Sequence, residues 1–387
     1  MINPVRGFPR AEYDARVVRA QSLMNKAGLD ALLLSTEPDV RYFTGFLTRF
    51  WESPTRPWFV VLPQSGAPVA VIPSIGAALM AKTWITDART WRAPDLTDDG
   101  VSLLAQTLID CIGAARVGVP MGLETHLRMP LADWHRLGEQ VPNIRFDPDA
   151  GIMRELRMIK SEAEIDKIRA ACDIAGRAFA RVPEIAQAGV GLDQVFRRFQ
   201  MLCLENGADW VPYLAGGCDQ GGYDDVISPA GPAPLRPGDV LMLDTGLVRD
   251  GYFCDFDRNF SVGPASEPVR SAHKKLTEAS DAAAAIAQPG TTAADLFHRM
   301  DKIVTGGAGG SDAGRLGHGL GMQLTEGLSL IPTDHTILEP GMVLTLEPGI
   351  TLPNGRIMVH EENIVIRDGP PEFLSPRVSG DIPELAG

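Results

Sequence analysis

Up to residue 154, segments whose apolar residues have helical spacing alternate with segments that have the apolar pattern of strands. Residues 11–27 are apolar at helical spacing, and Gly28 is typical of a helix end. The run at 31–35 predicts a short buried strand, and the runs at 58–63 and 67–73, separated by a glycine-containing turn, predict a hairpin. Further elements are expected as helices at 101–112 and 127–139 and a strand at 116–120. Residues 1–154 are therefore expected to form an α/β domain with a mixed sheet.

A different pattern begins at residue 155. Ser161 and Glu164 have the spacing of a capping box at the start of a long helix. One apolar face of that helix comprises Ile165, Ile168, Cys172, Ala175 and Phe179. Strands are expected at 240–248, 251–262, 341–350 and 356–366, and further helices at 192–206, 267–288 and 292–304. Residues 155–387 thus predict an α+β domain whose sheet presents one polar face.

Length and composition narrow the class of protein. A chain of 387 residues is too long for one ordinary core and suggests two domains. The net charge of −13, without a block of Lys or Arg, argues against a nucleic-acid partner. The sequence has no apolar run of membrane-spanning length, and its start does not resemble a signal peptide. Five cysteines without a CxxC pair indicate free thiols, so we expect a cytoplasmic protein.

Two acidic residues interrupt apolar segments near a predicted turn. Asp244 lies in a strand-like run, Asp255 follows eleven residues later, and 249–251 is a turn signal. If the hairpin is centred on residues 249 and 250, the two carboxylates face each other with Cβ atoms roughly 4.5–5.5 Å apart. A buried pair at that spacing is costly unless it is protonated or binds cations. The alternative, a pair of solvated turn acids, is disfavoured by the apolar neighbours Leu243 and Phe253.

Other polar residues interrupt later apolar segments. Glu347 lies in "VLTLEPGI", Glu361 and Glu362 lie in "MVHEENIVI", and His318 is flanked by glycines that allow close approach. A lone buried histidine is more often structural than a metal ligand. Four carboxylates and an imidazole on one face of a sheet, however, form an oxygen-rich site that suits two Mn²⁺, Co²⁺, Fe²⁺ or Zn²⁺ ions.

These stretches, in this order, resemble a known superfamily. The segments "DTGLVRDGYFCDFDR", "GHGLG", "LEPGI" and "HEENIVI" are similar to those of methionine aminopeptidase, prolidase, aminopeptidase P and creatinase. "PDVRYFTGF" at 38–46 resembles the N-terminal domain of the prolidase–creatinase branch, and "LRMIKSEAEIDKIRAA" resembles the entry into its catalytic domain. The resemblance implies a creatinase-type domain at 1–154 and a pita-bread catalytic domain at 155–387.

The resemblance also implies roles for individual residues. The metal ligands would be Asp244, Asp255, His318, Glu347 and Glu361. Asp255 and Glu361 would bridge two ions, and Glu347 would handle the proton of the attacking water. Glu361 is preferred over Glu362 because the family's glutamate precedes the first apolar residue of the strand, here Ile364, by three positions.

The chain departs from the family where relatives carry two substrate-contacting histidines. Seven residues after His318 stands Thr325, followed by Glu326. The other expected position falls near Tyr223 and Asp224. Neither Thr nor Asp can donate a proton as an imidazolium does near neutral pH. These four residues are candidate substrate contacts in place of the histidines.

Two further features accompany the metal site. Asp257 shares a face with Asp255 by strand alternation and would orient a ligand or water, together with Arg258; a plain pairing of Asp257 with Arg258 or another base is the alternative. The aromatic and basic loop at 48–58 contains Arg49 and Trp51, which could bind a carboxylate or a flat group. Its alternative is a packed inter-domain loop. The resemblance further implies a homodimer.

Three functions are compatible with these residues. The first is a dinuclear metal-dependent hydrolase of a small amide or dipeptide, prolidase-like, acting as an Xaa-Pro dipeptidase or aminopeptidase. The second is a creatinase-like C–N hydrolase or lyase for a non-peptide metabolite, which the absent histidines favour. The third, a non-catalytic binding protein of the same fold, is disfavoured because the ligand set is complete.

Overall fold

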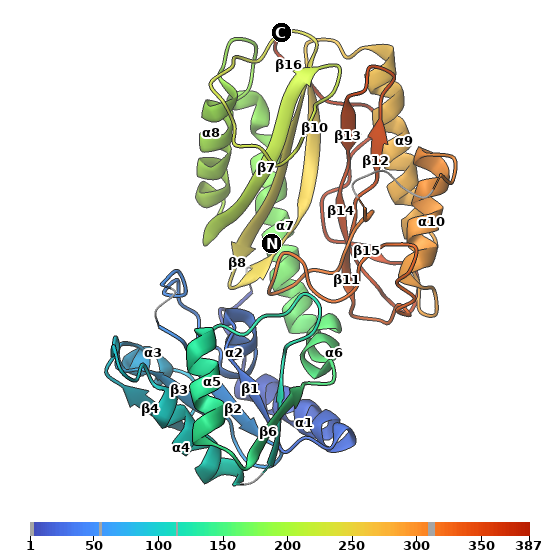
Figure 1. Cartoon of the computed structure of the whole chain (residues 1–387). Coiled ribbons are helices and arrows are strands. Elements are labelled where there is room, and N and C mark those ends of the chain that lie inside the picture. Colours follow the sequence, from blue (N-terminus) through green and yellow to red (C-terminus); the bar gives the residue numbers. More distant parts are fainter. Residues whose placement is uncertain (1–3, 54–55, 114, 309–313) are drawn as a thin grey trace. The chain divides into compact units, whose positions relative to one another are not determined.

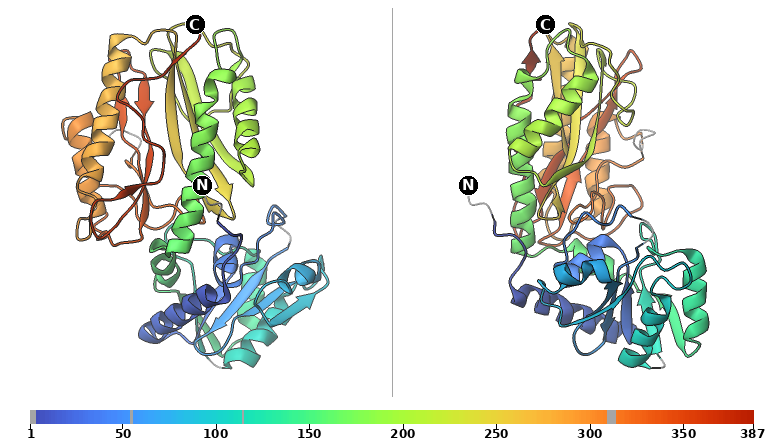
Figure 2. Two further views of the ribbon diagram at one scale, coloured as in Figure 1. Left: turned by 180° about the vertical axis from the view of Figure 1, so that it is seen from behind. Right: turned by 90° about the vertical axis from the view of Figure 1, so that its left-hand side faces the viewer.

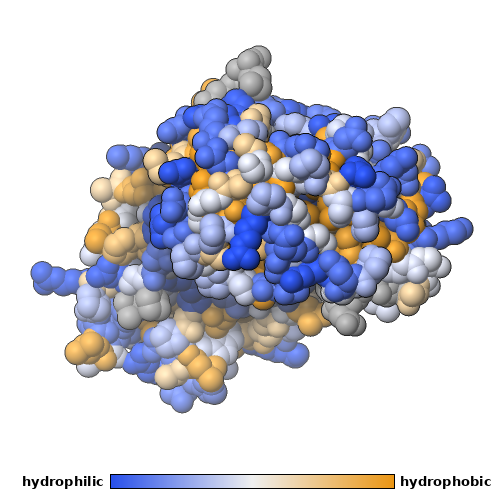
Figure 3. Space-filling model, turned by 90° about the horizontal axis from the view of Figure 1, so that it is seen from above, coloured by the Kyte–Doolittle hydropathy of each residue, from blue (hydrophilic) through white to orange (hydrophobic). Residues whose placement is uncertain are grey.

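The computed structural model describes residues 4–53, 56–113, 115–308 and 314–387. The chain divides into two compact units, Val5–Leu156 and one built mainly from Arg157–Gly387. No helix within the described ranges is long and apolar enough to cross a membrane. The face seen in Figure 3 mixes mainly hydrophilic residues with smaller hydrophobic areas.

The N-terminal unit is built around one mixed sheet of six strands in the order β4-β3-β2-β1-β5-β6. The predicted hairpin is confirmed, because β2 and β3 pair antiparallel; β5 and β6 pair parallel. The strands are β1 (Ala31–Leu34), β2 (Phe59–Pro63), β3 (Val69–Pro73), β4 (Asp87–Trp91), β5 (Ala115–Val119) and β6 (Ile144–Pro148). The helices are α1 (Arg10–Ala27), α2 (Glu37–Thr44), α3 (Ala77–Met80), α4 (Val101–Ile112), α5 (Leu131–Gln140) and α6 (Ile152–Met158).

The C-terminal unit combines three sheets with four long helices (Figure 1). One sheet has the order β16-β10-β8-β7, with β9 paired to β8; the others are β11-β14-β15 and β12-β13. Its strands are β7 (Trp210–Gln220), β8 (Asp239–Arg249), β9 (Tyr252–Phe253), β10 (Phe256–Val262), β11 (Val343–Leu346), β12 (Gly349–Thr351), β13 (Ile357–Val359), β14 (Glu362–Val365), β15 (Glu372–Phe373) and β16 (Glu384–Leu385). Its helices are α7 (Glu162–Ala180), α8 (Leu192–Glu205), α9 (Glu267–Ala284) and α10 (Ala293–Val304).

The helices of the C-terminal unit cover its sheets in pairs. Helix α7 packs against β8, and α8 packs against α7 and β7 (Figure 2, left). Helices α9 and α10 pack on each other, and α9 contacts β11, β12 and β13 (Figure 1). The predicted capping box is confirmed: the Ser161 hydroxyl accepts from the Glu164 N–H, and the Glu164 carboxylate accepts from the Ser161 N–H.

Strand β7 was not predicted by the apolar pattern, because glycines interrupt it. At Gly216 the backbone φ is 148°, and a Cβ there would lie 2.2 Å from the carbonyl oxygen of Met242 on β8. At Gly217 a Cβ would lie 2.7 Å from the Asp225 carbonyl oxygen. The glycines therefore allow β7 to lie close to β8 and to the following loop, where a side chain would not fit.

Three of the long strands expected from the sequence are each interrupted by a short break. Asp255 lies between β9 and β10, Glu347 lies between β11 and β12, and Glu361 lies between β13 and β14. In continuous strands, the direction of each carboxylate would follow from the regular alternation of side chains between the two faces of the sheet. Because of the breaks, all three acids lie in the short segments between strands.

Candidate metal centre

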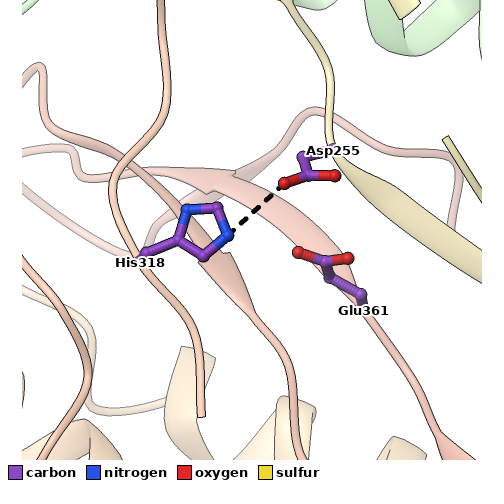
Figure 4. Close-up of side chains that lie close together, drawn as sticks. All are labelled: Asp255, His318 and Glu361. Carbon is purple, nitrogen blue, oxygen red and sulfur yellow. Dashed lines mark ion pairs between the residues drawn. The ribbon is translucent and has the colours of Figure 1, made fainter. Parts of the chain in front are cut away.

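Asp255, His318 and Glu361 converge from three segments that are far apart in the sequence (Figure 4). One donor atom from each lies within 4.8 Å of the others, and all three side chains are buried. The Nε2 atom of His318 is 3.4 Å from Oδ2 of Asp255. Nδ1 of His318 is 3.0 Å from the carbonyl oxygen of Gly319, which can only accept a hydrogen bond. A neutral His318 that donates there has its Nε2 lone pair directed at the acids, as a metal ligand requires.

The acids of this cluster are electrostatically unfavourable without a counter-charge. Burial, together with the charges of neighbouring acids, raises the pKa of Asp244 and Glu361 well above the usual carboxyl range. Burial also raises the pKa of Asp255 well above that range, and the positive charge of Arg315 opposes the rise. Asp244 Oδ1, Asp255 Oδ1 and Glu361 Oε1 are buried without a hydrogen-bond partner. Such oxygens are costly unless they bind cations, so the residues fit a site for divalent metal ions.

Glu347, like Asp244, is not among the three residues whose donor atoms lie within 4.8 Å of one another. Its backbone N–H donates to the carbonyl oxygen of Leu316, two residues before His318, at 2.9 Å. Its side chain is only partly buried, unlike the other acids of the cluster. Burial raises the pKa of Glu347 to about 7, opposed by the charge of His318 and increased by that of Asp255. Glu347 is thus the least buried of these acids.

Glu361 and Glu362 have different surroundings, although they are adjacent. Glu362 is 3.0 Å from Nη2 of Arg258 and 3.3 Å from Nε2 of His360, and it also accepts a hydrogen bond from Ser375. Within the described part of the chain, Glu361 has no such cation, and its Oε1 has no hydrogen-bond partner. These contacts favour Glu361 as the ligand and leave Glu362 neutralised within the protein.

The cross-strand register corrects one expectation. Asp257, not Asp255, lies directly opposite Asp244 in the β8–β10 ladder. The reversal uses Asp250 and Gly251, with φ values of 50° and 79°, rather than a turn centred on residues 249 and 250. Two residues with positive φ form the tight turn that suits a hairpin, and this moves the pairing by two residues.

Asp257 supports the cluster from this position. Its Oδ1 accepts the backbone N–H of Glu361 at 3.1 Å and lies 3.6 Å from Nδ1 of His360. Arg258 bonds the carbonyl oxygen of Asp257, not its carboxylate, and also donates to the carbonyl oxygen of Glu361 at 3.0 Å. Together, Asp257 and Arg258 fix the backbone of Glu361 from both sides.

Other supporting residues were missed by the sequence analysis. The Tyr213 hydroxyl donates to Oδ2 of Asp244 at 2.9 Å. The Asn363 side chain accepts the N–H of Asp255 at 3.0 Å and donates to the Asp255 carbonyl oxygen. Thr345 Oγ1 accepts the N–H of His318 at 3.1 Å. Asn363 lies two residues after Glu361 and Thr345 lies two residues before Glu347, but the contacts themselves join residues that are distant in the sequence.

The candidate substrate residues of the C-terminal unit are separated by the structure. Tyr223 is buried, and its hydroxyl accepts from the Val359 N–H at 2.7 Å. Asp224 is exposed, 2.6 Å from Arg356. The buried Glu326 is paired with Arg157 and Lys160. Thr325 is partly buried, and its hydroxyl accepts a hydrogen bond from Arg315 at 3.1 Å.

The other two candidates belong to the N-terminal unit. Arg49 is exposed and lies 3.2 Å from Glu52. The ring of Trp51 packs against Trp58, with centroids 5.8 Å apart, and the guanidinium of Arg128 lies over it. Within the loop at 48–58, residues 54 and 55 lie outside the described residues.

Comparison with known proteins agrees with this architecture. The sequence model of the creatinase/prolidase N-terminal domain matches residues 16–159, and that of metallopeptidase family M24 matches residues 166–368. The probable dipeptidase PepE of Mycobacterium tuberculosis is 29% identical over 367 residues, which are 93% of each chain. The Xaa-Pro dipeptidase of Pyrococcus horikoshii is 26% identical over 363 residues, covering 92% of this chain and 95% of that protein.

Solved structures show the same fold. The crystal structure of dipeptidase PepE from Mycobacterium ulcerans, 26% identical, superimposes with a TM-score of 0.83 and covers 98% of this chain and 100% of that chain. A recombinant prolidase from Thermococcus sibiricus, 23% identical, has a TM-score of 0.84 over 98% of this chain and 100% of that chain. The expected architecture, a creatinase-type N-terminal domain followed by a pita-bread catalytic domain, is confirmed. Because the catalytic-domain match spans more than half of the sequence, the chain belongs to metallopeptidase family M24.

Proposed function

We propose that this protein is a dinuclear metal-dependent hydrolase that cleaves a C–N bond of a small substrate, with Xaa-Pro dipeptides as the first candidates. The observation that carries the proposal is the buried set of Asp255, His318 and Glu361, whose donor atoms converge beside carboxylate oxygens that lack hydrogen-bond partners. The names of relatives support the substrate class, since they include an Xaa-Pro dipeptidase and a probable dipeptidase.

Two divalent ions would be held by Asp244, Asp255, His318, Glu347 and Glu361, and the family resemblance implies that Asp255 and Glu361 would serve both ions. When bound, such ions lower the pKa of an attacking water and polarise the scissile carbonyl. We propose Mn²⁺, Co²⁺, Zn²⁺ or Fe²⁺, because carboxylates with one imidazole suit these ions and discriminate poorly among them.

The protein's own residues would position the site and move protons. We assign Glu347 to take the proton of the attacking water and deliver it to the leaving nitrogen, because it is the least buried acid of the cluster. Tyr213 would hold the Asp244 carboxylate in one orientation through its hydrogen bond. Asp257 and Arg258 would hold Glu361 through its backbone, and a metal ligand fixed in this way needs less reorganisation on binding.

Among the candidate substrate contacts, we retain Thr325. Its partner Arg315 carries a positive charge that acts on Asp255 and Glu347, which associates this residue pair with the cluster. We assign structural roles to Tyr223, whose hydroxyl bonds backbone, and to Glu326, which is neutralised by two cations. The roles of Asp224, Arg49 and Trp51 remain proposals that single substitutions at each position can test.

The direct test is hydrolysis of Xaa-Pro dipeptides by protein loaded with Mn²⁺ or Co²⁺, with the metal content measured on the same sample. We expect turnover by the wild type and its loss in Glu347→Ala. The control is Asp281→Asn. Asp281 is an exposed acid on α9 that pairs with Arg377, so we expect this variant to keep both turnover and metal. A folded, metal-loaded wild type without turnover, or a Glu347→Ala variant that retains it, would contradict the proposal.

A second candidate is hydrolysis of a non-peptide C–N bond, such as that of a cyclic amidine or guanidino compound. The observation that favours it is that Thr325 stands at one position where the family resemblance implies a substrate-contacting histidine, and that Tyr223 and Asp224, not a histidine, lie near the other. Turnover of such compounds, but not of Xaa-Pro dipeptides, by the same loaded sample would select it.

The cellular setting is part of the same proposal. All five cysteines are free thiols in this fold, which supports a reducing, cytoplasmic location. A homodimer is proposed from family resemblance alone, and light scattering of the purified protein tests it.

A further inference from the structure

Asn363 and Thr345 are directly opposite each other in the β11–β14 ladder, next to two of the proposed metal ligands. Thr345 lies two residues before Glu347, and Asn363 lies two residues after Glu361. Opposite residues of an antiparallel pair point to the same face of the sheet. The side chains of Asn363 and Thr345 therefore share one face, and the ladder fixes both relative to the two glutamates.

The Asn363 side chain holds Asp255 in the break between β9 and β10. Its Oδ1 accepts the Asp255 N–H at 3.0 Å, and its Nδ2 donates to the Asp255 carbonyl oxygen. A backbone N–H only donates and a carbonyl oxygen only accepts, so the two bonds also fix which way the amide is turned. Two residues of an antiparallel ladder exchange the same two bonds. The amide of Asn363 thus takes the place of a neighbouring strand where the regular strand is interrupted.

Thr345 holds His318 by a comparable pair of bonds. Thr345 Oγ1 accepts the His318 N–H at 3.1 Å, and the Thr345 N–H donates to the His318 carbonyl oxygen at 2.7 Å. The pair of Asn363 and Thr345 therefore connects four of the five proposed ligands, two through these contacts and two along the strands: Asp255, His318, Glu347 and Glu361.

Asn363 is itself held on several sides. The Cys172 thiol on α7 donates to Asn363 Oδ1 at 3.2 Å, and the Ser375 hydroxyl accepts the Asn363 N–H at 3.0 Å. The Leu374 N–H donates to the Asn363 carbonyl oxygen at 2.8 Å. Asn363 and Cys172 are fully buried. The amide therefore has little freedom to turn away from Asp255, because a buried polar group that loses its partners is costly.

Asp257 and Asn363 form a reciprocal contact between the segments of two ligands. Asp257, two residues after Asp255, accepts the Glu361 N–H at 3.1 Å. Asn363, two residues after Glu361, bonds both backbone groups of Asp255. Each ligand is thus followed, at the second position, by a side chain that fixes the backbone of the other ligand. Ligands held by such outer contacts are already oriented before an ion binds.

We propose that Asn363 is a positioning residue that holds Asp255 in register with Glu361 and so preorganises the metal centre. The proposal rests on the metal-dependent function above. Asn363 acts through the backbone of Asp255, because both ends of its amide are used in hydrogen bonds within the protein. Without this amide the β11–β14 ladder keeps its backbone bonds, but the Asp255 segment gains freedom.

Hydrogen exchange in the metal-free protein tests the contact between Asn363 and Asp255. In Asn363→Ala, the Asp255 amide should exchange roughly ten times faster than in the wild type, as for loss of one hydrogen bond, with a smaller increase at Glu361. The matched control is Asn259→Ala. Asn259 is also buried, and it also joins β10 to the segment before Glu361, because its Nδ2 donates to the Val359 carbonyl oxygen at 2.7 Å. This control should leave the exchange of the Asp255 amide unchanged.

Titration of the chelated protein with Co²⁺ tests the positioning role. Asn363→Ala should weaken Co²⁺ affinity about 10- to 100-fold, as for loss of an outer partner of a ligand, and should change the visible absorption spectrum of the bound Co²⁺. Asn259→Ala should lower the melting temperature as much but keep the affinity and the spectrum. If Asn363→Ala does not fold, Asn363→Ser takes its place, because a serine keeps a polar group but is too short to hold both backbone groups.

The outcomes separate this inference from the proposed function. Asn363 variants that bind Co²⁺ as tightly as Asn259→Ala, or that leave the exchange of the Asp255 amide unchanged, would overturn the positioning role. A wild type that binds no Co²⁺ would overturn both proposals. Neither measurement uses a substrate, so a lack of dipeptide hydrolysis by metal-loaded protein would contradict the proposed function alone.

Discussion

Asp257 lies directly opposite Asp244 in the β8–β10 ladder, and both carboxylates are buried. Cross-strand partners on one face of a sheet are close enough for like charges to repel. Asp257 Oδ2 also has no hydrogen-bond partner, although Oδ1 accepts the Glu361 N–H. Asp257 therefore adds repulsion in the metal-free protein and holds a ligand when metal is present.

The first prediction follows from these opposing effects. Asp257→Asn should weaken metal affinity by about 10- to 100-fold, as for loss of an outer partner of a ligand, and should not lower the melting temperature of the metal-free protein. Titration calorimetry and thermal unfolding after chelation measure the two quantities. If Asp257→Asn instead lowers the melting temperature of the metal-free protein and leaves the metal affinity unchanged, Asp257 supports the fold and not the metal site.

The second prediction distinguishes the adjacent acids Glu361 and Glu362. Glu361→Gln should lower the number of ions bound, because it removes a proposed bridging carboxylate. Glu362→Gln should keep that number but lower the free energy of unfolding by about 3–5 kcal/mol, because it leaves the buried Arg258 without its carboxylate. Elemental analysis and urea unfolding check both outcomes; the reverse pattern would transfer the ligand role to Glu362.

The third prediction concerns pH and Glu326. Burial alone would raise its pKa, but the charges of Arg157 and Lys160 lower the pKa of Glu326 below its usual value. A lowered folded pKa contributes stability above the unfolded pKa of about 4.3, and this contribution is lost as pH falls through the folded pKa. Glu326→Gln should therefore destabilise the protein by about 3–5 kcal/mol at neutral pH, and the difference from wild type should shrink below about pH 4.3.

Urea unfolding of both proteins at neutral and acidic pH measures this difference. The control is Glu162→Gln, which removes an exposed partner of Arg367 and should cost less than about 1 kcal/mol. A difference for Glu326→Gln that stays constant with pH would mean that the ion pairs contribute little.

The fourth prediction concerns removal of the metal. At neutral pH, chelation should lower the melting temperature, because the buried acids Asp244, Asp255 and Glu361 then lack a counter-charge. Adding Mn²⁺ or Co²⁺ back should raise it progressively, by the equivalent of about 2.7 kcal/mol at a free concentration 100 times Kd. In His318→Ala, the melting temperature should change less on chelation and on metal addition. A wild-type melting temperature that changes with neither treatment would argue against these residues as a metal site.

Local sequence patterns predicted those parts of the fold that depend on neighbours along the chain. The capping box of α7 and the hairpin of β2 and β3 are short-range features, and both are confirmed. The predicted pairing across the turn after β8 was wrong by two residues, because apolar alternation does not specify which pair of turn residues adopts positive φ. The strand breaks at Asp255, Glu347 and Glu361 also escaped prediction, since apolar residues continue on both sides of each break.

The supporting contacts of the candidate site could not be predicted for a related reason. Tyr213 and Asp244 are 31 positions apart, and Asn363 and Asp255 are 108 apart. Arg315 and Thr325 are only ten apart, but nothing in their local pattern indicates that their side chains meet. Such pairs are created by the packing of one segment on another, so a single sequence does not reveal them.

The convergence of Asp255, His318 and Glu361 has a consequence for how the protein folds. Their segments are widely separated in sequence, so no early local structure brings the donors together. Long-range contacts of this kind form late because loop closure must come first. Metal affinity is acquired only when the native topology is nearly complete, because the unfolded chain has no preformed site. Ion uptake during refolding would therefore time the last stage of assembly in this protein.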